Sequence, residues 1–408
     1  MPELPEVEAA RKRLSKLAKG KKIKRVVANE DPIVFSGTTH ANFATSLQGK
    51  TVEDVRRLGK NFYMVLSSPP HALFHFGMSG MAHIRGEPSP VYRVPRSKGA
   101  AEDWPPKYCK TCITFSEPDG EDGGEGAEVG QWAFCDPRRL GRIKLVEVED
   151  GGEVEKVPPL SELGADPLLN MPSVDSLRAS LAKRNAPIKA VLLDQNGPLC
   201  GIGNYMVDEI LFQSAIHPSH PASHLSTLLP SPSFSSSSSP SPTLRAPNSS
   251  SPDALETLHT NILYVTRTAV DADADADKFP KSWLFSRRWG KGKKKKGEEE
   301  VFELPDGSTS SLSFLTVGGR TSCIVDTVQV LPAEFAGEAK AKKGVVKAKG
   351  VGKRKKADSE EEEEREAEAQ ELDREEAEEE KRAEVTSPHF KRRRRVKREN
   401  LKEETDSE

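Results

Sequence analysis

The sequence predicts an α+β protein in which an N-terminal helix leads into a two-sheet β-sandwich and a helical domain follows. Three observations carry this prediction. Near the start of the chain, apolar residues recur at every third or fourth position, which is typical of an amphipathic helix. Short β-rich runs separated by turn-forming clusters continue to residue 148. Helical spacing of apolar residues then returns at 173–217 and 253–270.

The first helix is predicted from Val7, Ala10, Leu14 and Leu17, which have lysines and arginines between them. Pro5 and several glutamates come early in this pattern, where helix N-termini favour proline and acidic side chains. The chain is therefore expected to enter its first helix within a few residues of its start.

The β-sandwich is predicted from short runs that are rich in β-branched and aromatic residues. These runs are residues 23–27, 51–58, 62–66, 72–76, 112–115 and 143–148. Many short strands between turns are typical of a sandwich. The acidic, glycine-rich stretch 117–130 is predicted to be an exposed loop. We place this first domain at 2–150.

The second domain is predicted over 170–330, with helices that flank glycine-bearing turns. The Ser/Pro-rich insert 218–252 cannot bury enough apolar surface to fold. Strand-like pieces at 314–317 and 323–328 surround Gly318-Gly319-Arg320 and predict a small β-element within 310–330.

Residues 335–408 are predicted to be a disordered, charged tail, Lys-rich at first, then Glu-rich, then basic at 391–398. Basic clusters of this kind are typical of nuclear import signals or nucleic-acid patches. We therefore expect a nuclear protein whose tail binds nuclear partners, with plain solvated charge as the alternative.

Composition excludes several classes of protein. The formal net charge is -2, but residues 1–70 hold 13 Lys/Arg against 7 Asp/Glu, a weak sign of nucleic-acid contact. The 5 scattered cysteines do not suggest a disulfide framework. The start is acidic and lacks the apolar core of a signal peptide, and no apolar run approaches the roughly 20 residues of a membrane span. We expect a soluble, intracellular protein that makes no membrane contact and acts as a monomer.

Pro2 is the first candidate catalytic residue, because removal of Met1 would leave a free secondary amine at the chain start. Amines form Schiff bases with sugar carbons, and an α-amino group with a pKa of about 7.7–8.0 is partly neutral near pH 7. Glu3 lies beside it as a proton carrier, and Glu6 is placed to cap the helix or support the site. The competing interpretation is that Pro2 and Glu3 merely begin a helix.

Four motifs give this chain a resemblance to the formamidopyrimidine-DNA glycosylase family. They are Met-Pro-Glu-Leu-Pro-Glu-Val-Glu at 1–8, His-Phe-Gly-Met-Ser-Gly at 75–80, Asp-Pro-Arg-Arg-Leu-Gly at 136–141, and the stretch 194–212 with Gly-Ile-Gly-Asn-Tyr. All four occur in the family's order and at plausible spacing, which makes the signal highly specific. The resemblance covers about residues 2–217 and 253–330.

The resemblance implies a catalytic role for four residues. Pro2 attacks deoxyribose C1′, and Glu3 is its acid/base partner. Lys60 matches the family's active-site lysine, which binds phosphate and assists β-elimination; a solvated lysine at a strand end is the alternative. Arg320, at the tip of a finger-like hairpin, contacts phosphates and supports δ-elimination.

The resemblance also implies a set of DNA contacts. Met78, Arg138 and Leu140 match the three residues that fill the space left by an extruded base. The family usually has phenylalanine where this chain has Leu140, and Met78 could equally be a core methionine. The remaining expected contacts are Asn204 of the helix-two-turn-helix motif, Arg184, Lys189 and Tyr108, which stands where many relatives have histidine. Glu209 is expected to support the site.

No metal or other cofactor is expected. Bacterial relatives hold zinc with two Cys-x-x-Cys pairs, whereas region 279–330 contains only Cys323. The resemblance therefore implies a zincless finger at 310–330, of the plant and fungal type. Cys109-x-x-Cys112 lies elsewhere and has no partner pair. A substrate-cap loop is expected near 287–312, and its sequence is divergent.

The predicted function is that of a bifunctional DNA glycosylase and abasic-site lyase of base excision repair. It would act on double-stranded DNA with an oxidised purine, such as 8-oxoguanine or formamidopyrimidine, or with an abasic site, and would cleave by β,δ-elimination. The sequence leaves the preferred lesion open. A non-catalytic damaged-DNA-binding protein on the same fold is the second hypothesis, and a nuclear scaffold acting through its tail is the third.

Overall fold

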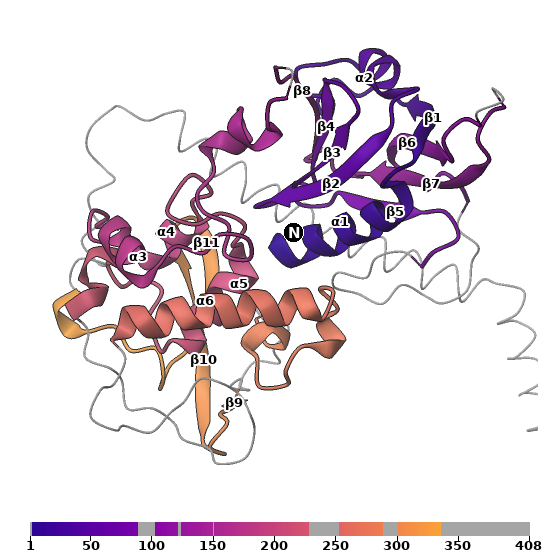
Figure 1. Ribbon diagram of the computed structural model, residues 1–408. Coiled ribbons are helices and arrows are strands. Elements are labelled where there is room, and N and C mark those ends of the chain that lie inside the picture. Colours follow the sequence, from indigo (N-terminus) through magenta and orange to yellow (C-terminus); the bar gives the residue numbers. More distant parts are fainter. Residues whose placement is uncertain are drawn as a thin grey trace, which may run out of the picture. The chain divides into compact units, whose positions relative to one another are not determined.

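The computed structural model describes residues 2–88, 103–120, 124–149, 151–227, 253–288 and 301–335 (Figure 1). The predicted tail, most of the Ser/Pro-rich insert and the middle of the expected cap loop lie outside these residues.

Helix α1 (Leu4–Ala18) begins where the sequence places its start. The Glu6 carboxylate accepts a hydrogen bond of 2.8 Å from the backbone N–H of Glu3, which satisfies one donor that a helix N-terminus leaves unpaired. Val7, Ala10 and Leu14 of its apolar stripe are buried and Leu17 is half-buried, and the helix packs against β2 and β3 (Figure 1).

Two antiparallel four-stranded sheets follow, as expected for a sandwich. The first contains, in spatial order, β1 (Lys22–Ala28), β6 (Cys109–Ser116), β7 (Glu128–Cys135) and β5 (Met81–Ile84). The second contains β2 (Val52–Leu58), β3 (Asn61–Leu66), β4 (His71–His75) and β8 (Arg142–Val146). Their shared core is aromatic: the rings of Phe62 and Phe74 stack 5.1 Å apart, and Trp132 meets Phe74 edge-on.

Three elements of this domain were not predicted. Helix α2 (His40–Leu47) is short and capped by Thr39, whose hydroxyl accepts from the N–H of Asn42 at 3.1 Å. Strand β5 has four residues, too few for a clear alternation. Strand β7 begins at Glu128, inside the predicted loop 117–130, because pairing with β6 and β5 outweighs its weak local signal.

The second domain is helical, with helices α3 (Val174–Leu181), α4 (Ile188–Leu193), α5 (Asn204–Gln213) and α6 (Ala254–Asp271). Asp253 caps α6 by accepting from the N–H of Glu256 at 2.7 Å. Short 3₁₀ segments connect the larger elements: η1 (Val154–Lys156), η2 (Leu160–Glu162), η3 (Ala222–Thr227), η4 (Ala276–Lys278) and η5 (Leu284–Ser286).

A three-stranded sheet completes this domain, with β9 (Val301–Glu303), β10 (Thr309–Val317) and β11 (Arg320–Val325) in the order β11-β10-β9. The β10–β11 hairpin is the predicted finger. It is anchored by an apolar cluster that includes Phe212 of α5, Leu312 and Val325.

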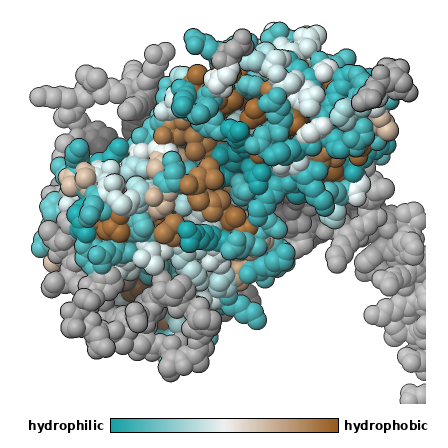
Figure 2. All heavy atoms as spheres, in the orientation of Figure 1, coloured by the Kyte–Doolittle hydropathy of each residue, from teal (hydrophilic) through white to brown (hydrophobic). Residues whose placement is uncertain are grey.

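Within the described ranges, no helix is long and apolar enough to cross a bilayer. On the face drawn in Figure 2, hydrophilic side chains cover much of the surface and hydrophobic residues form separate patches.

Candidate active site

The side chain of Glu3 is buried at the N-terminus of α5. Its carboxylate oxygens accept hydrogen bonds from the backbone N–H groups of Tyr205 at 2.9 Å and Met206 at 3.1 Å. These are first-turn donors, which a helix leaves unpaired, and they favour a negative charge. Burial nevertheless raises the pKa of Glu3, against the opposing effects of Lys60 and of these two N–H groups. Glu3 is therefore fixed in position, and its raised pKa makes the carboxyl easier to protonate.

The residues around Glu3 fix the chain start in place. The N–H of Leu4 donates to the carbonyl of Gly201 at 3.1 Å, and the Leu4 side chain lies in the core of the helical domain. Val7, one turn further along α1, lies in the core of the sandwich. Pro2 is buried just before this junction.

Lys60 lies in the turn between β2 and β3, next to Gly59, whose φ of +59° suits a glycine. Burial lowers the pKa of Lys60, the charge of Glu3 raises it, and the charge of Arg320 lowers it again. Lys60 therefore lies within electrostatic reach of both Glu3 and Arg320, although 317 positions separate Glu3 from Arg320 in the sequence. Glu3 directly follows the buried Pro2, so Lys60 acts between the chain start and the hairpin that carries Arg320.

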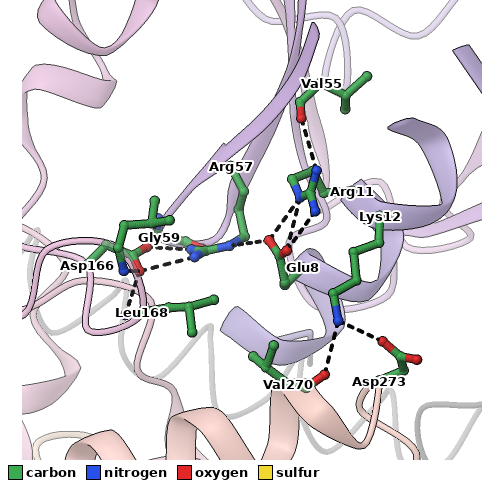
Figure 3. Close-up of polar contacts among 11 residues, drawn as sticks. Glu8, Arg11, Lys12, Val55, Arg57, Gly59, Asp166, Leu168, Val270 and Asp273 are labelled. Carbon is green, nitrogen blue, oxygen red and sulfur yellow. Dashed lines mark hydrogen bonds and ion pairs between the residues drawn. The ribbon is translucent and has the colours of Figure 1, made fainter. Parts of the chain in front are cut away.

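Arg57 holds the Lys60 turn in position (Figure 3). Its guanidinium donates to the Glu8 carboxylate at 3.0 Å, to the carbonyl of Gly59 at 2.9 Å and to the Asp166 carboxylate at 3.1 Å, with a second, shorter contact to Asp166. Asp166 also accepts from the N–H of Gly59 at 2.8 Å. Arg57 and Asp166 are both buried, so this network rigidly links α1, the β2–β3 turn and the segment that leads into the helical domain.

Glu6 supports the N-terminus as predicted from its position, through the bond to the N–H of Glu3. Burial, followed by the negative charge of Glu3, raises the pKa of Glu6 to about 7. The neighbouring Tyr205 phenol is fully buried, and burial together with the charges of Glu6 and Glu3 raises its pKa. The site thus contains two adjacent carboxyl groups, those of Glu3 and Glu6, and the charge of one disfavours ionisation of the other.

The two loops that carry Met78, Arg138 and Leu140 are bound to each other. Buried Asp136 accepts from the Ser79 hydroxyl at 2.6 Å, from the N–H of Arg138 at 3.2 Å and from the N–H of Gly141 at 2.6 Å. The three predicted void-filling side chains are partly exposed and lie on this jointly held pair of loops.

Asn204 begins α5, and its side-chain amide donates to the carbonyl of Thr321 at 3.1 Å, which connects the helix to the finger next to Arg320. Arg184 is partly exposed and forms an ion pair of 3.3 Å with Asp194. Tyr108 is 54% exposed on a backbone with φ of 60°.

Lys189 lies inside the protein, in contrast to the expectation of a surface phosphate contact. Its ammonium is fully buried and donates to Asp208 at 2.8 Å, to the Ser322 hydroxyl at 2.8 Å and to the carbonyl of Thr321 at 3.0 Å. Arg288 reaches the other oxygen of Asp208 at 2.8 Å. The predicted phosphate contact of Lys189 has no support from this geometry, which instead makes Lys189 a clamp between α4, α5 and the finger.

Sequence reasoning missed Asp208, Arg288 and His75 as members of this region. Asp208 lies beside Glu209 in a largely apolar helix. An acidic residue at such a position needs a buried partner, and this is the signal from which it could have been found. Burial, followed by the charge of Lys60, lowers the pKa of His75 to about 4, so its imidazole is neutral near pH 7.

Glu209 is buried on the far side of α5. It accepts from the N–H of Leu284 at 2.8 Å and from the Gln213 amide at 2.8 Å, and burial raises its pKa to about 8. It therefore supports the segment around η5 and does not reach the catalytic group. Among the described residues, no set of three or more His, Cys, Asp or Glu side chains is arranged to hold a metal ion.

Comparisons with known proteins define the class of this protein. The family described as "Formamidopyrimidine-DNA glycosylase N-terminal domain" matches residues 1–143, and "Formamidopyrimidine-DNA glycosylase H2TH domain" matches residues 163–228. A formamidopyrimidine-DNA glycosylase of Arabidopsis thaliana is 38% identical over 352 residues, which cover 86% of this chain and 77% of the relative. One from Bradyrhizobium sp. is 34% identical over 231 residues, 56% of this chain and 71% of the relative. The chain belongs to the formamidopyrimidine-DNA glycosylase family.

Solved structures share the fold. The Lactococcus lactis formamidopyrimidine-DNA glycosylase bound non-covalently to DNA containing an abasic site superimposes with a TM-score of 0.54 at 21% identity, covering 81% of this chain and all of the other. MutM in complex with DNA containing carbocyclic 8-oxoguanine gives a TM-score of 0.55 at 21% identity, with the same coverage. The predicted fold class, with its N-terminal helix, β-sandwich and helix-two-turn-helix domain, is confirmed.

Proposed function

We propose that this chain, a DNA glycosylase of base excision repair by its family, excises an oxidised purine with Pro2 as nucleophile and then cuts the strand. One observation supports the proposal: Lys60 interacts electrostatically both with Glu3, which adjoins the buried Pro2, and with Arg320. Schiff-base chemistry on a phosphate-flanked sugar uses an amine, a proton carrier and cations of this kind.

In the proposed reaction, the neutral Pro2 amine attacks deoxyribose C1′ and the N-glycosidic bond breaks, so that the base leaves with its bonding electrons. Glu3 donates a proton as the sugar ring opens, and an iminium forms between Pro2 and C1′. The raised pKa of Glu3 suits this step, because it favours the protonated form of the carboxyl, which can act as a general acid.

Strand cleavage follows from the same iminium in the proposed scheme. Loss of a proton from C2′ expels the 3′ phosphate, and a second elimination expels the 5′ phosphate. Lys60 and Arg320 are the cations of the site, and they would stabilise the departing phosphates. The lowered pKa of Lys60 also leaves a larger fraction of its amine neutral than in an ordinary lysine, so that more of it is available to accept a proton.

The proposed substrate is duplex DNA with the damaged nucleotide turned out of the stack, since its reacting atoms are inaccessible inside a helix. The loops tied together at Asp136 would insert Met78 and Leu140 into the vacated space, and Arg138 would hydrogen-bond the unpaired base. Asn204 and Arg184 are the remaining candidates for phosphate contact.

Borohydride trapping on DNA with an abasic site tests the nucleophile. Protein whose Met1 removal has been verified by mass is compared with Pro2→Gly and Glu3→Gln. We expect a covalent complex with the unaltered chain, a severe loss in the Pro2 variant, and retained trapping on abasic DNA with lost base excision in the Glu3 variant. A folded, processed protein that gives no complex would leave a non-catalytic damaged-DNA-binding protein.

We also propose a nuclear location that depends on the tail. The basic cluster at 391–398 supports it and lies outside the described residues. A fluorescent fusion of the full chain should concentrate in nuclei, and deletion of 335–408 should abolish this while leaving excision intact. Equal distribution of both fusions would contradict the proposal.

A further inference from the structure

Sulfur-bearing side chains gather on the outer face of the sheet β1-β6-β7-β5. Trp132 and Phe134 of β7 belong to the sandwich core, so Cys135, next after Phe134, points to the opposite face. Cys135 is paired directly with Cys109 of β6 on one side and with Met81 of β5 on the other. Residues in direct register share a face, so the two cysteine side chains lie next to each other.

The backbone around this cysteine pair has the geometry that a cross-strand disulfide needs. The N–H of Asp136 donates to the carbonyl of Tyr108 at 3.1 Å, immediately outside the pair. The register of β6 shifts between Cys109 and Thr111, so this pair lies next to an irregular step of the ladder, but the two residues remain direct partners. Direct partners in an antiparallel ladder have Cα atoms about 4.5–5.5 Å apart. Disulfides accept Cα separations of about 4.4–6.8 Å, so the two residues can be joined without moving the strands far.

The two thiols already interact and are differently accessible. The Cys135 thiol donates a hydrogen bond to the Cys109 sulfur, which lowers the pKa of Cys109, and the charge of Lys110 acts in the same direction against burial. Cys109 is partly exposed, whereas Cys135 is 3% exposed. Cys109 is therefore the thiol that an oxidant reaches first.

Cys112 is the competing partner for Cys109, and its environment disfavours it. Its direct partner is Ala133, two positions along β7 from Cys135. Burial raises the pKa of Cys112 to about 11, and the charge of Cys109 adds to this effect. Cys112 thus stays protonated and is a poor nucleophile.

We propose that Cys109 and Cys135 form a reversible disulfide when hydrogen peroxide oxidises the protein. The Cys109 thiolate attacks one peroxide oxygen, the O–O bond breaks, and a sulfenic acid forms with release of water after protonation. The Cys135 sulfur then attacks the Cys109 sulfur, the S–O bond breaks, and a second water leaves with the thiol proton. Two thiols and one peroxide give one disulfide and two waters, and the peroxide receives both electrons.

The proposed disulfide would lie next to Asp136. Cys135 directly precedes Asp136, the carboxylate that ties together the loops of Met78 and Arg138. The disulfide would covalently join β6 to the strand end from which the Arg138 loop departs.

The test uses the full chain treated with hydrogen peroxide, then denatured and labelled with N-ethylmaleimide, since Cys135, Cys200 and Cys323 are buried in the folded protein. None of the 5 cysteines is in a disulfide in the structure, so the reduced protein should take up five labels and the oxidised protein three. Peptide mapping should find Cys109 linked to Cys135, and dithiothreitol should restore all five labels. Cys112→Ser and Cys200→Ser should keep the link, whereas Cys135→Ser should lose it.

Cys109→Ser provides a second variant at a partly exposed site, in case Cys135→Ser does not fold. It should leave Cys135 free to be labelled after peroxide. The proposal is overturned if Cys109 links to Cys112, if Cys109 is oxidised to a sulfinic acid while Cys135 remains free, or if all five thiols survive peroxide that oxidises glutathione in the same tube.

Discussion

The carboxyl group of Glu3 occupies the space that any side chain at Gly203 would fill. A Cβ atom at Gly203 would lie 2.1 Å from Cδ of Glu3 and 2.5 Å from one of its oxygens. The backbone at Gly203 is extended, with φ of -121°, so the requirement for glycine here comes from this close approach and not from an unusual backbone conformation. The glycine gives Glu3 access to the first N–H groups of α5.

Gly203→Ala should therefore displace Glu3 and remove base excision. We expect a loss of at least a hundredfold in single-turnover excision and about 1–3 kcal/mol of stability, which is the usual cost of overpacking. Gly130→Ala is the matched control, because its Cβ would meet only the flexible tip of Leu17, at 2.9 Å. A Gly203→Ala protein with full excision would show that Glu3 is not held as described.

Arg57→Gln should destabilise the protein by about 3–5 kcal/mol, because it leaves the buried carboxylate of Asp166 without its partner. Arg56→Gln, one residue earlier, removes only a surface side chain that is paired with Asp54 at 3.0 Å and should cost less than about 1 kcal/mol. Urea unfolding of the two variants measures the difference. Equal midpoints would contradict a structural role for the Arg57 network.

Glu209 should make stability depend on pH in the neutral range. Its pKa is raised to about 8 in the folded protein, so the folded state holds this proton more tightly than the unfolded chain. The associated stability is fully present below the unfolded pKa of about 4.3 and is lost as pH rises to about 8, at most on the order of 5 kcal/mol. Glu209→Gln should flatten thermal unfolding temperatures measured between pH 5 and 9, whereas a change at exposed Glu162 should not.

Leu140→Phe should strengthen binding to abasic-site DNA. A phenylalanine stacks on a neighbouring base where leucine only fills space, and about 1 kcal/mol of extra stacking corresponds to roughly fivefold in Kd. Fluorescence anisotropy against matched undamaged duplex measures the gain. Val27→Phe, at a site 42% exposed on β1, controls for an added aromatic ring. Unchanged affinity of Leu140→Phe would argue against insertion of this residue.

The short motifs allowed most of the fold to be predicted, because each one combines local spacing with a chemical signature. Helix α1 followed from the spacing of its apolar residues, and most strands followed from short β-rich runs between turns. Strand β7 was not predicted, because its first residues, Glu128 to Gly130, lie in an expected loop and the strand is ordered by its pairing with β5 and β6. Pairing of this kind is a tertiary effect that outweighs local propensity.

The site residues that lie in short motifs could also be predicted, whereas those with distant partners could not. Pro2, Glu3 and Lys60 lie in recognisable motifs, and the structure places Glu3 and Lys60 together. Lys189 was expected to face DNA because lysine usually does, but its acceptor Asp208 is 19 residues away and the finger closes over both. A single sequence does not reveal that such a cation has a buried partner.

The bonds of Glu3 have a consequence for how the chain matures. Its acceptor contacts to Tyr205 and Met206 span 202 and 203 residues. At ribosomal rates of about 5–20 residues per second, the N-terminus emerges roughly 10–40 s before the helix that will enclose it. Met1 can be removed from the nascent chain during this interval, while Pro2 is still accessible to a peptidase. Under the proposed mechanism, the Pro2 amine would gain its complete site only after the helical domain has been synthesised and folded, so a chain that ends before this domain should be inactive.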